Sequence, residues 1–288
     1  MSRRVVRQAT LVAVPLLLAA CSVRGNVGPM PATSPQASGS RSPGKLVPGA
    51  DATGPGATTP TPARTIPRAT YNDEGPVGSM AKTFLRPSPA SRLIVEVDWA
   101  SGRDPSSLAL THLQNVLESV TDKPGGVRVV RGSQIPASKD EYSIRDLHGL
   151  EAAHRSSLSG GDTATMWFVF LNGSLAENAD ALGVSYEASA AAIFEDRIQS
   201  STTALFQASE IERSVLTHEA GHLLALVNIG YKSAFDHEDA DHPHHSKNSG
   251  SVMYWAVEDV SVRSLLGGGP PSEFDEQDKA DLKMLATQ

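Results

Sequence analysis

The stretch His218-Glu219-Ala220-Gly221-His222 (HEAGH) decides how the rest of this chain of 288 residues is interpreted. On a helix, residues four positions apart lie one turn apart on the same face, so His218 and His222 can bind one metal ion together. Imidazole nitrogens at this spacing are typical zinc ligands, and Glu219 would then stand beside a zinc-bound water molecule. Because zinc lowers the pKa of such a water to about 7, a neighbouring carboxylate can take its proton. The stretch therefore predicts a zinc site with Glu219 as the general base.

The flanking sequence predicts the helix independently. Ser209 and Glu212 have the spacing of a capping box, which would begin a helix, and Gly230 would end it. Between them, apolar residues and the two histidines recur at steps of three and four, as on one face of a helix: Ile211, Val215, His218, His222, Leu226 and Ile229. The alternative is a core helix with polar residues near its surface, but burying His, Glu and His without partners would be costly.

The first 21 residues predict an export signal. Three arginines precede a twelve-residue apolar run, 9–20, which is too short for a bilayer span of ~20 residues. Leu18-Ala19-Ala20-Cys21 resembles the lipobox of bacterial lipoproteins, in which the Cys is acylated and becomes the mature N-terminus. The alternative is an ordinary cleaved signal with an incidental Cys. Since Cys21 is the only cysteine, no intrachain disulfide is expected.

Composition divides the rest of the chain into a predicted disordered tether, 22–90, and one globular domain, 91–288. Twelve of the nineteen prolines lie between residues 29 and 89, among Gly, Ser, Thr and Ala. Such a segment has too little apolar surface to offset the entropy of ordering it. The net charge of −7 and the lack of a Lys/Arg cluster argue against a nucleic-acid partner.

Strands and helices are predicted to alternate through the domain. Apolar patterns predict strands at 93–99, 126–135 and 166–171 and helices at 106–120, 142–154 and 273–285. Residues 184–198, where Ala alternates loosely with polar residues, predict an edge strand. This order of elements predicts an α/β three-layer fold that includes the HEAGH helix and a C-terminal helix.

Downstream of HEAGH, Ser251-Val252-Met253-Tyr254-Trp255 resembles the Met-turn of the metzincin zinc peptidases. The predicted order of elements over 91–288 is similar to that family as well. The resemblance implies a zincin domain with a mixed sheet, Zn²⁺ as cofactor, a peptide or protein substrate, and Met253 beneath the metal. Taken alone, Met253 would be interpreted as a core residue. Tyr254 is a candidate hydrogen-bond donor to the oxyanion of the reaction, or else a packing residue.

The chain departs from the metzincin pattern HExxHxxGxxH or HExxHxxGxxD at two positions. Ala225 stands where the pattern has the Gly that turns the chain, and Asn228 stands where it has the last ligand. Asn is a poor zinc ligand compared with His, Asp or Glu. We therefore expect the helix to continue to Gly230 and the third ligand to come from farther along the chain.

A His- and Asp-rich loop, 231–250, supplies the candidates for that ligand. His245 stands eight residues before Met253, the spacing between the third zinc His and the Met in the matrixin branch of metzincins. The resemblance therefore implies His245, with 231–244 as an insertion, and leaves His237 and His242 as alternatives. Loop 236–245 could also hold a second zinc or calcium ion, or bind metal weakly without function.

Together, these features predict an exported, lipid-anchored zinc metalloendopeptidase at the extracytoplasmic face of a bacterial membrane, or released from it. His218, His222 and His245 would bind zinc, and Glu219 would act first as base and then as acid. An extended peptide would pair with the edge strand 184–198. One alternative is a lipoprotein that binds zinc or copper and has no need of the glutamate. Another is a degenerate peptidase fold kept as a binding module, which the two departures from the family pattern favour.

Overall fold

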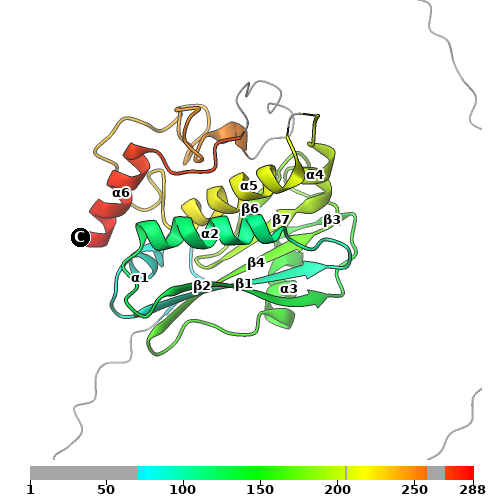
Figure 1. Ribbon diagram of the computed structural model, residues 1–288, viewed down its shortest axis with the longest axis horizontal. Coiled ribbons are helices and arrows are strands. Elements are labelled where there is room, and N and C mark those ends of the chain that lie inside the picture. Colours follow the sequence, from blue (N-terminus) through cyan, green and yellow to red (C-terminus); the bar gives the residue numbers. More distant parts are fainter. Residues whose placement is uncertain (1–70, 205, 258–269) are drawn as a thin grey trace, which may run out of the picture. The chain divides into compact units, whose positions relative to one another are not determined.

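The computed structural model describes residues 71–204, 206–257 and 270–288 (Figure 1). The predicted signal at 1–21, with Cys21, and residues 22–70 of the predicted tether lie outside the described residues. In the part of the chain that the structure describes, we find no helix both long and apolar enough to cross a bilayer.

A five-stranded sheet in the order β2-β1-β4-β7-β6 forms the centre of the domain. Its strands are β1 (Arg92–Ala100), β2 (Val127–Ile135), β4 (Thr163–Leu171), β6 (Gly183–Ser185) and β7 (Ala190–Phe194). All pairs are parallel except β6–β7, which is antiparallel. Nearly every residue of β4 is buried, as expected for a strand covered on both faces.

Helices cover both faces of the sheet (Figure 1). The long helices α2 (Ser107–Val120) and α5 (Ala208–Leu223) pack on one face, and α3 (Ile144–His154) packs on the other. Successive side chains of each strand point to opposite faces of the sheet and pack into two hydrophobic cores, one on each face. The remaining elements are α1 (Ala81–Leu85), α4 (Glu195–Ser200), α6 (Glu276–Thr287), the short strands β3 (Glu141–Tyr142) and β5 (Ser174–Leu175), and the 3₁₀ turn η1 (Trp255–Val257). The predicted α/β three-layer fold with a mixed sheet is confirmed.

The predicted edge strand at 184–198 is wrong in its extent. The segment comprises most of β6, a turn, all of β7 and the start of α4. Strand β7 reads Ala-Ala-Ala-Ile-Phe and is buried throughout, between β4 and β6. Its small side chains reflect close packing inside the domain rather than exposure at an edge, so the edge strand is the three-residue β6 alone.

The predicted start of the folded domain at residue 91 is too late. Phe84 and Leu85 of α1 are fully buried in the core. Farther upstream, Asp73 accepts a hydrogen bond from Arg155 Nη2 at 3.2 Å, and both side chains are buried. Proline content placed the boundary at 90, but a few buried anchors are enough to order residues 71–90 against the domain.

Helix α5 begins at a different cap from the predicted one. Gln207 is the N-cap, and it forms a capping box with Glu210 instead of Ser209 with Glu212. Glu212 instead accepts a hydrogen bond from the backbone N–H of Ser106 at 2.6 Å, which ties α5 to the start of α2.

The same helix ends at Leu223, so its predicted continuation to Gly230 is wrong. Ala225 turns the chain by adopting a φ of 69°, the left-handed conformation in which glycine is usual. Ala225 is 3% exposed and packs against Gly78. A Cβ added at Gly78 would stand only 3.0 Å from the Cβ of Ala225. Tertiary packing therefore enforces the turn that the local sequence argued against.

Candidate metal centre

Helix α5 carries His218, Glu219 and His222 into the interior of the domain. His218 and Glu219 are fully buried and His222 is 7% exposed. Since buried polar side chains are costly without partners, their surroundings indicate what they do.

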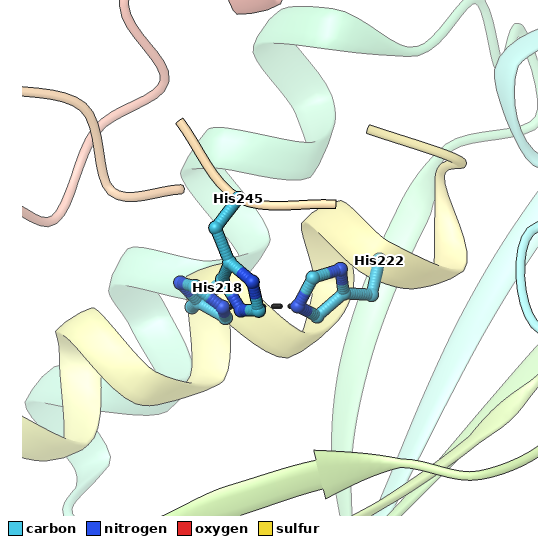
Figure 2. Close-up of side chains that lie close together, drawn as sticks. All are labelled: His218, His222 and His245. Carbon is cyan, nitrogen blue, oxygen red and sulfur yellow. Dashed lines mark hydrogen bonds between the residues drawn. The ribbon is translucent and has the colours of Figure 1, made fainter. Parts of the chain in front are cut away.

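The loop after α5 brings His245 to the two helix histidines (Figure 2). The Nε2 atoms of His218 and His222 are 3.0 Å apart, and the ring centroid of His245 lies 5.2 Å from that of His218 and 5.0 Å from that of His222. One ring nitrogen from each histidine lies within 4.8 Å of the others. Two Zn–N bonds of about 2.0–2.1 Å at a tetrahedral angle separate their nitrogens by about 3.3 Å. The three side chains therefore fit one ion.

Backbone carbonyls orient two of the three rings. His218 Nδ1 lies 2.7 Å from the carbonyl oxygen of Val252, and His245 Nδ1 lies 3.0 Å from that of Pro243. Because a carbonyl oxygen only accepts, Nδ1 carries the hydrogen in both rings, and each Nε2 keeps a lone pair for a ligand bond. Histidines that bind metals are typically oriented in this way.

The other two candidate ligands lie elsewhere. His237 is 1% exposed, and its Nε2 is 3.0 Å from the carboxylate of Asp281 in α6. The ring of His242 stacks on that of Trp255, with centroids 4.0 Å apart. Within the described ranges, no group of three metal-binding side chains includes His237 or His242, and loop 236–245 forms no such group by itself. His237 instead fastens the loop to α6.

Asn228, which occupies the ligand position of the family pattern, holds the loop in place. Its side chain donates to Oε2 of Glu238 at 2.6 Å and accepts from the backbone N–H of Ser233 at 2.6 Å. Farther on, the N–H of Ser246 donates to the carbonyl of Met253 at 2.7 Å. These bonds fix the two ends of the segment that delivers His245.

Met253 packs directly against the HEAGH turn. It is fully buried, and a Cβ added at Gly221 would stand 2.3 Å from its sulfur. Gly221, the second of the two variable residues in HExxH, is therefore glycine for a steric reason, and Met253 lies against the helix turn that carries both ligands. Tyr254 is half-buried with its ring tilted against Trp255 at 5.5 Å, and its described contacts do not bring its hydroxyl group to the histidines.

Strand β6 positions the carboxylate of Glu219. The Ser185 hydroxyl donates to Oε2 of Glu219 at 2.8 Å and also lies 3.0 Å from its backbone oxygen. A Cβ at Gly183 would stand 2.6 Å from Oε1, so only glycine leaves room for the carboxylate there. Neither Gly183 nor Ser185 could be assigned this role from the sequence, because no local pattern shows that β6 packs against α5.

A cavity of about 380 Å³ opens beside His222 and His245. Val184 and Ser185 of β6 line one side, and Pro243 of the loop lines another. Cavities of this size hold small ligands or a short piece of a larger one. The cavity thus lies between the edge strand β6 and the loop that carries His245. Two of the three imidazoles, His222 and His245, line it, whereas His218 and Glu219 are fully buried and do not.

No protein-family model matches the chain, and no curated protein matches its sequence. Among solved structures, archaemetzincin from Methanopyrus kandleri is similar with a TM-score of 0.46 and 17% identity, over 69% of this chain and 98% of that one. Archaemetzincin from Archaeoglobus fulgidus, complexed with malonate, gives a TM-score of 0.40 and 14% identity, over 65% of this chain and 98% of that one. Similarity at this level carries no conclusion about function, which has to come from the geometry of the site.

Proposed function

We propose that this protein is a zinc-dependent peptidase in which His218, His222 and His245 bind the metal. The observation that carries the proposal is the convergence of these three imidazoles beside the buried carboxylate of Glu219. Three protein ligands with a fourth position left open are typical of catalytic zinc sites. When bound there, zinc would polarise the scissile carbonyl and make a bound water acidic enough to be deprotonated near neutral pH.

Glu219 is the proton carrier in this proposal. It directly follows a ligand on α5, it is fully buried, and the Ser185 hydroxyl fixes its Oε2. Held in this way, the carboxylate would accept a proton from the attacking water and pass it to the leaving amine. A metal carrier would have no use for a buried carboxylate at this position, and burying it would cost stability without return.

The edge strand indicates how a substrate would lie. Strand β6 stands at the end of the sheet and lines the cavity beside His222 and His245. An extended peptide that adds to β6 as a further strand would bring its backbone past the histidines. A chain bound in this way continues beyond the cavity in both directions, which favours an endopeptidase. β6 thus takes the place of the longer edge strand expected at 184–198.

Metal analysis of the purified protein tests the ligand set. The wild type should hold one zinc ion more than the variant His218→Ala/His222→Ala, which keeps the fold's apolar core but lacks two of the three ligands. Equal zinc content in the two proteins would contradict the assignment.

We also propose that the protein is exported and anchored to the membrane through an acylated Cys21. The support is the positively charged start, the short apolar run and the lipobox-like Leu18-Ala19-Ala20-Cys21. In fractionated cells, Cys21→Ser should be released from the membrane or accumulate unprocessed. Membrane association and processing identical to the wild type would contradict lipidation.

A further inference from the structure

A second cluster of metal-binding side chains lies on the opposite face of the sheet, where α3 meets the β6–β7 turn. His148 and Glu151 are three residues apart on α3, and Glu187 belongs to the turn. One ligand atom from each of the three lies within 4.8 Å of the other two. Among the described residues, this cluster and the three histidines beside Glu219 are the groups that meet this condition.

The carboxylate of Glu187 is buried and incompletely paired. Glu187 is 7% exposed and Glu151 is 6% exposed, whereas His148 is partly open to solvent. His148 Nδ1 contacts Oε1 of Glu187. No hydrogen-bond donor of the described residues reaches Oε2 of Glu187, although that atom is buried. A buried carboxylate oxygen without a donor or a cation is costly, so the cluster is short of positive charge at this atom.

Charge around the cluster leads to the same conclusion. It lines a cavity of about 470 Å³ together with a third carboxylate, Glu74, and a single guanidinium, Arg155. Arg155 is already engaged, with Nη1 2.6 Å from Oε1 of Glu151 and Nη2 3.2 Å from Oδ1 of Asp73. Three lining carboxylates face one guanidinium, and a divalent cation would balance the excess of carboxylates.

We propose that His148, Glu151 and Glu187 bind a divalent transition-metal ion, for which Zn²⁺ is the best match. One imidazole and two carboxylates suit zinc, whereas calcium and magnesium prefer sites made of oxygen alone. Tyr186 orients two of the ligands: its hydroxyl donates to Oε2 of Glu151 at 3.0 Å, and its ring meets that of His148 at a centroid distance of 5.3 Å. Bonds of this kind typically hold metal ligands in place.

An ion at this position would fasten the β6–β7 turn to α3. The turn follows Ser185, whose hydroxyl group bonds to the carboxylate of Glu219. The ion would therefore limit the movement of the strand that positions Glu219. This consequence rests on the proposed function, whereas binding of the ion does not.

A shared proton is the rival explanation for the close carboxylates. Burial and the neighbouring Glu151 raise the pKa of Glu187 to about 8, so that near neutral pH a proton could hold the two side chains together. The two explanations differ in one outcome, because a proton alone leaves the cluster without affinity for zinc.

Equilibrium dialysis of the full-length protein against Zn²⁺, followed by metal analysis, tests the proposal. We expect two ions per chain for the wild type, one for Glu187→Gln, and one for His218→Ala/His222→Ala. Glu74→Gln is the matched control, because it removes the same charge from the same cavity without removing a ligand. It should retain both ions.

Thermal unfolding with and without added Zn²⁺ shows whether each variant is folded. Metal-free Glu187→Gln should unfold cooperatively, and zinc should raise its Tm less than that of the wild type, because one stabilising ligand is lost. Two ions in folded Glu187→Gln, or a wild type whose zinc disappears entirely in His218→Ala/His222→Ala, would overturn the second site. Equal losses in Glu74→Gln and Glu187→Gln would overturn the ligand assignment. Failure of the first site would instead appear as unchanged zinc content in His218→Ala/His222→Ala.

Discussion

Replacing Gly183 by alanine should displace the carboxylate of Glu219 while leaving the three histidines in place. The new Cβ would stand 2.6 Å from Oε1 of Glu219 and 2.9 Å from Cγ1 of Val215. Carbon–oxygen contacts of this kind are comfortable at about 3.5 Å, so the neighbours must retreat by roughly 1 Å. Strand β6 cannot easily retreat, since Gly183 is paired with Ile193 of β7. The flexible side chain of Glu219 therefore takes up most of the movement.

The expected size of the effect follows from this displacement. Overpacking a closed interior costs about 1–3 kcal/mol of folding free energy, and each kcal/mol lowers the Tm of a domain of this size by roughly 2–4 °C. Misplacing a catalytic group by about 1 Å can lower the rate on the order of 10²-fold. Gly183→Ala should accordingly be folded at room temperature, somewhat less stable, and strongly impaired in peptide hydrolysis.

The assay compares hydrolysis, zinc content and thermal unfolding of Gly183→Ala with those of the wild type and of Gly160→Ala. Gly160 is the matched control, because an added Cβ there meets nothing within 4 Å. A folded Gly183→Ala protein with wild-type activity would refute the view that β6 positions Glu219. If zinc were lost as well, the displacement would reach the metal ligands. The three histidines and Glu219 would then not be positioned independently, contrary to the roles assigned to them.

Three further predictions concern the site and the core. Ser185→Ala removes a hydrogen bond to a buried carboxylate, so hydrolysis should fall roughly tenfold at unchanged zinc content, and a loss of zinc would contradict the role given to Ser185. His245→Ala should lose zinc and activity together, whereas His242→Ala, which loses a stacked ring in the same loop, should keep both. The opposite result would mean that His242, and not His245, is the third zinc ligand. Burial raises the pKa of Glu195 from 4.5 to about 7, so the folded state binds more protons than the unfolded state between these values, and stability contributed by this group falls as pH rises through that window. One pKa unit corresponds to about 1.4 kcal/mol. In urea unfolding, Glu195→Gln should therefore be more stable than the wild type by up to about 3 kcal/mol at pH 8 but by less than about 1 kcal/mol at pH 5. Equal stability differences at the two pH values would contradict the raised pKa of Glu195.

Local sequence predicts the parts of this fold that local interactions determine. Continuous apolar runs such as 166–171 are buried strands, and Ser106 and Ser143 cap the helices α2 and α3 with their side chains, as their residue types favour. The pair His218 and His222 follows directly from helical spacing. The three-layer arrangement could also be predicted, because strands that alternate with helices along the chain are typical of α/β folds.

Tertiary contacts determine what the sequence could not show. Ala225 turns the chain just after α5 in a left-handed conformation that its own side chain disfavours, because this part of the chain packs against Gly78. The spacing of His245 before Met253 pointed to this residue as a ligand, but the bonds with which Asn228 holds the loop could not be read from the sequence, because the family pattern has a ligand at that position. Ser185 reaches Glu219 only because β6 is the edge strand beside α5.

The boundary of the domain is a further feature that local sequence does not predict, as residues 71–90 show. Their proline content is typical of a tether, but the short helix α1 and buried side chains such as Phe84 and Asp73 fix them to the folded part. The burial of these side chains depends on partners that are distant in the sequence. Composition averaged over a segment therefore placed the boundary of the domain too late.

Glu219→Gln, measured for zinc content and peptide hydrolysis together, tests the central claim most directly. The substitution preserves the shape of the side chain and all three histidines but removes the base. Zinc content should stay at the wild-type level, while hydrolysis falls by about 10²–10⁴-fold. Hydrolysis by zinc-loaded Glu219→Gln at the wild-type rate would contradict the mechanism, and a zinc-loaded wild type that cleaves no peptide would contradict the enzyme itself and favour a metal-binding lipoprotein or a binding module.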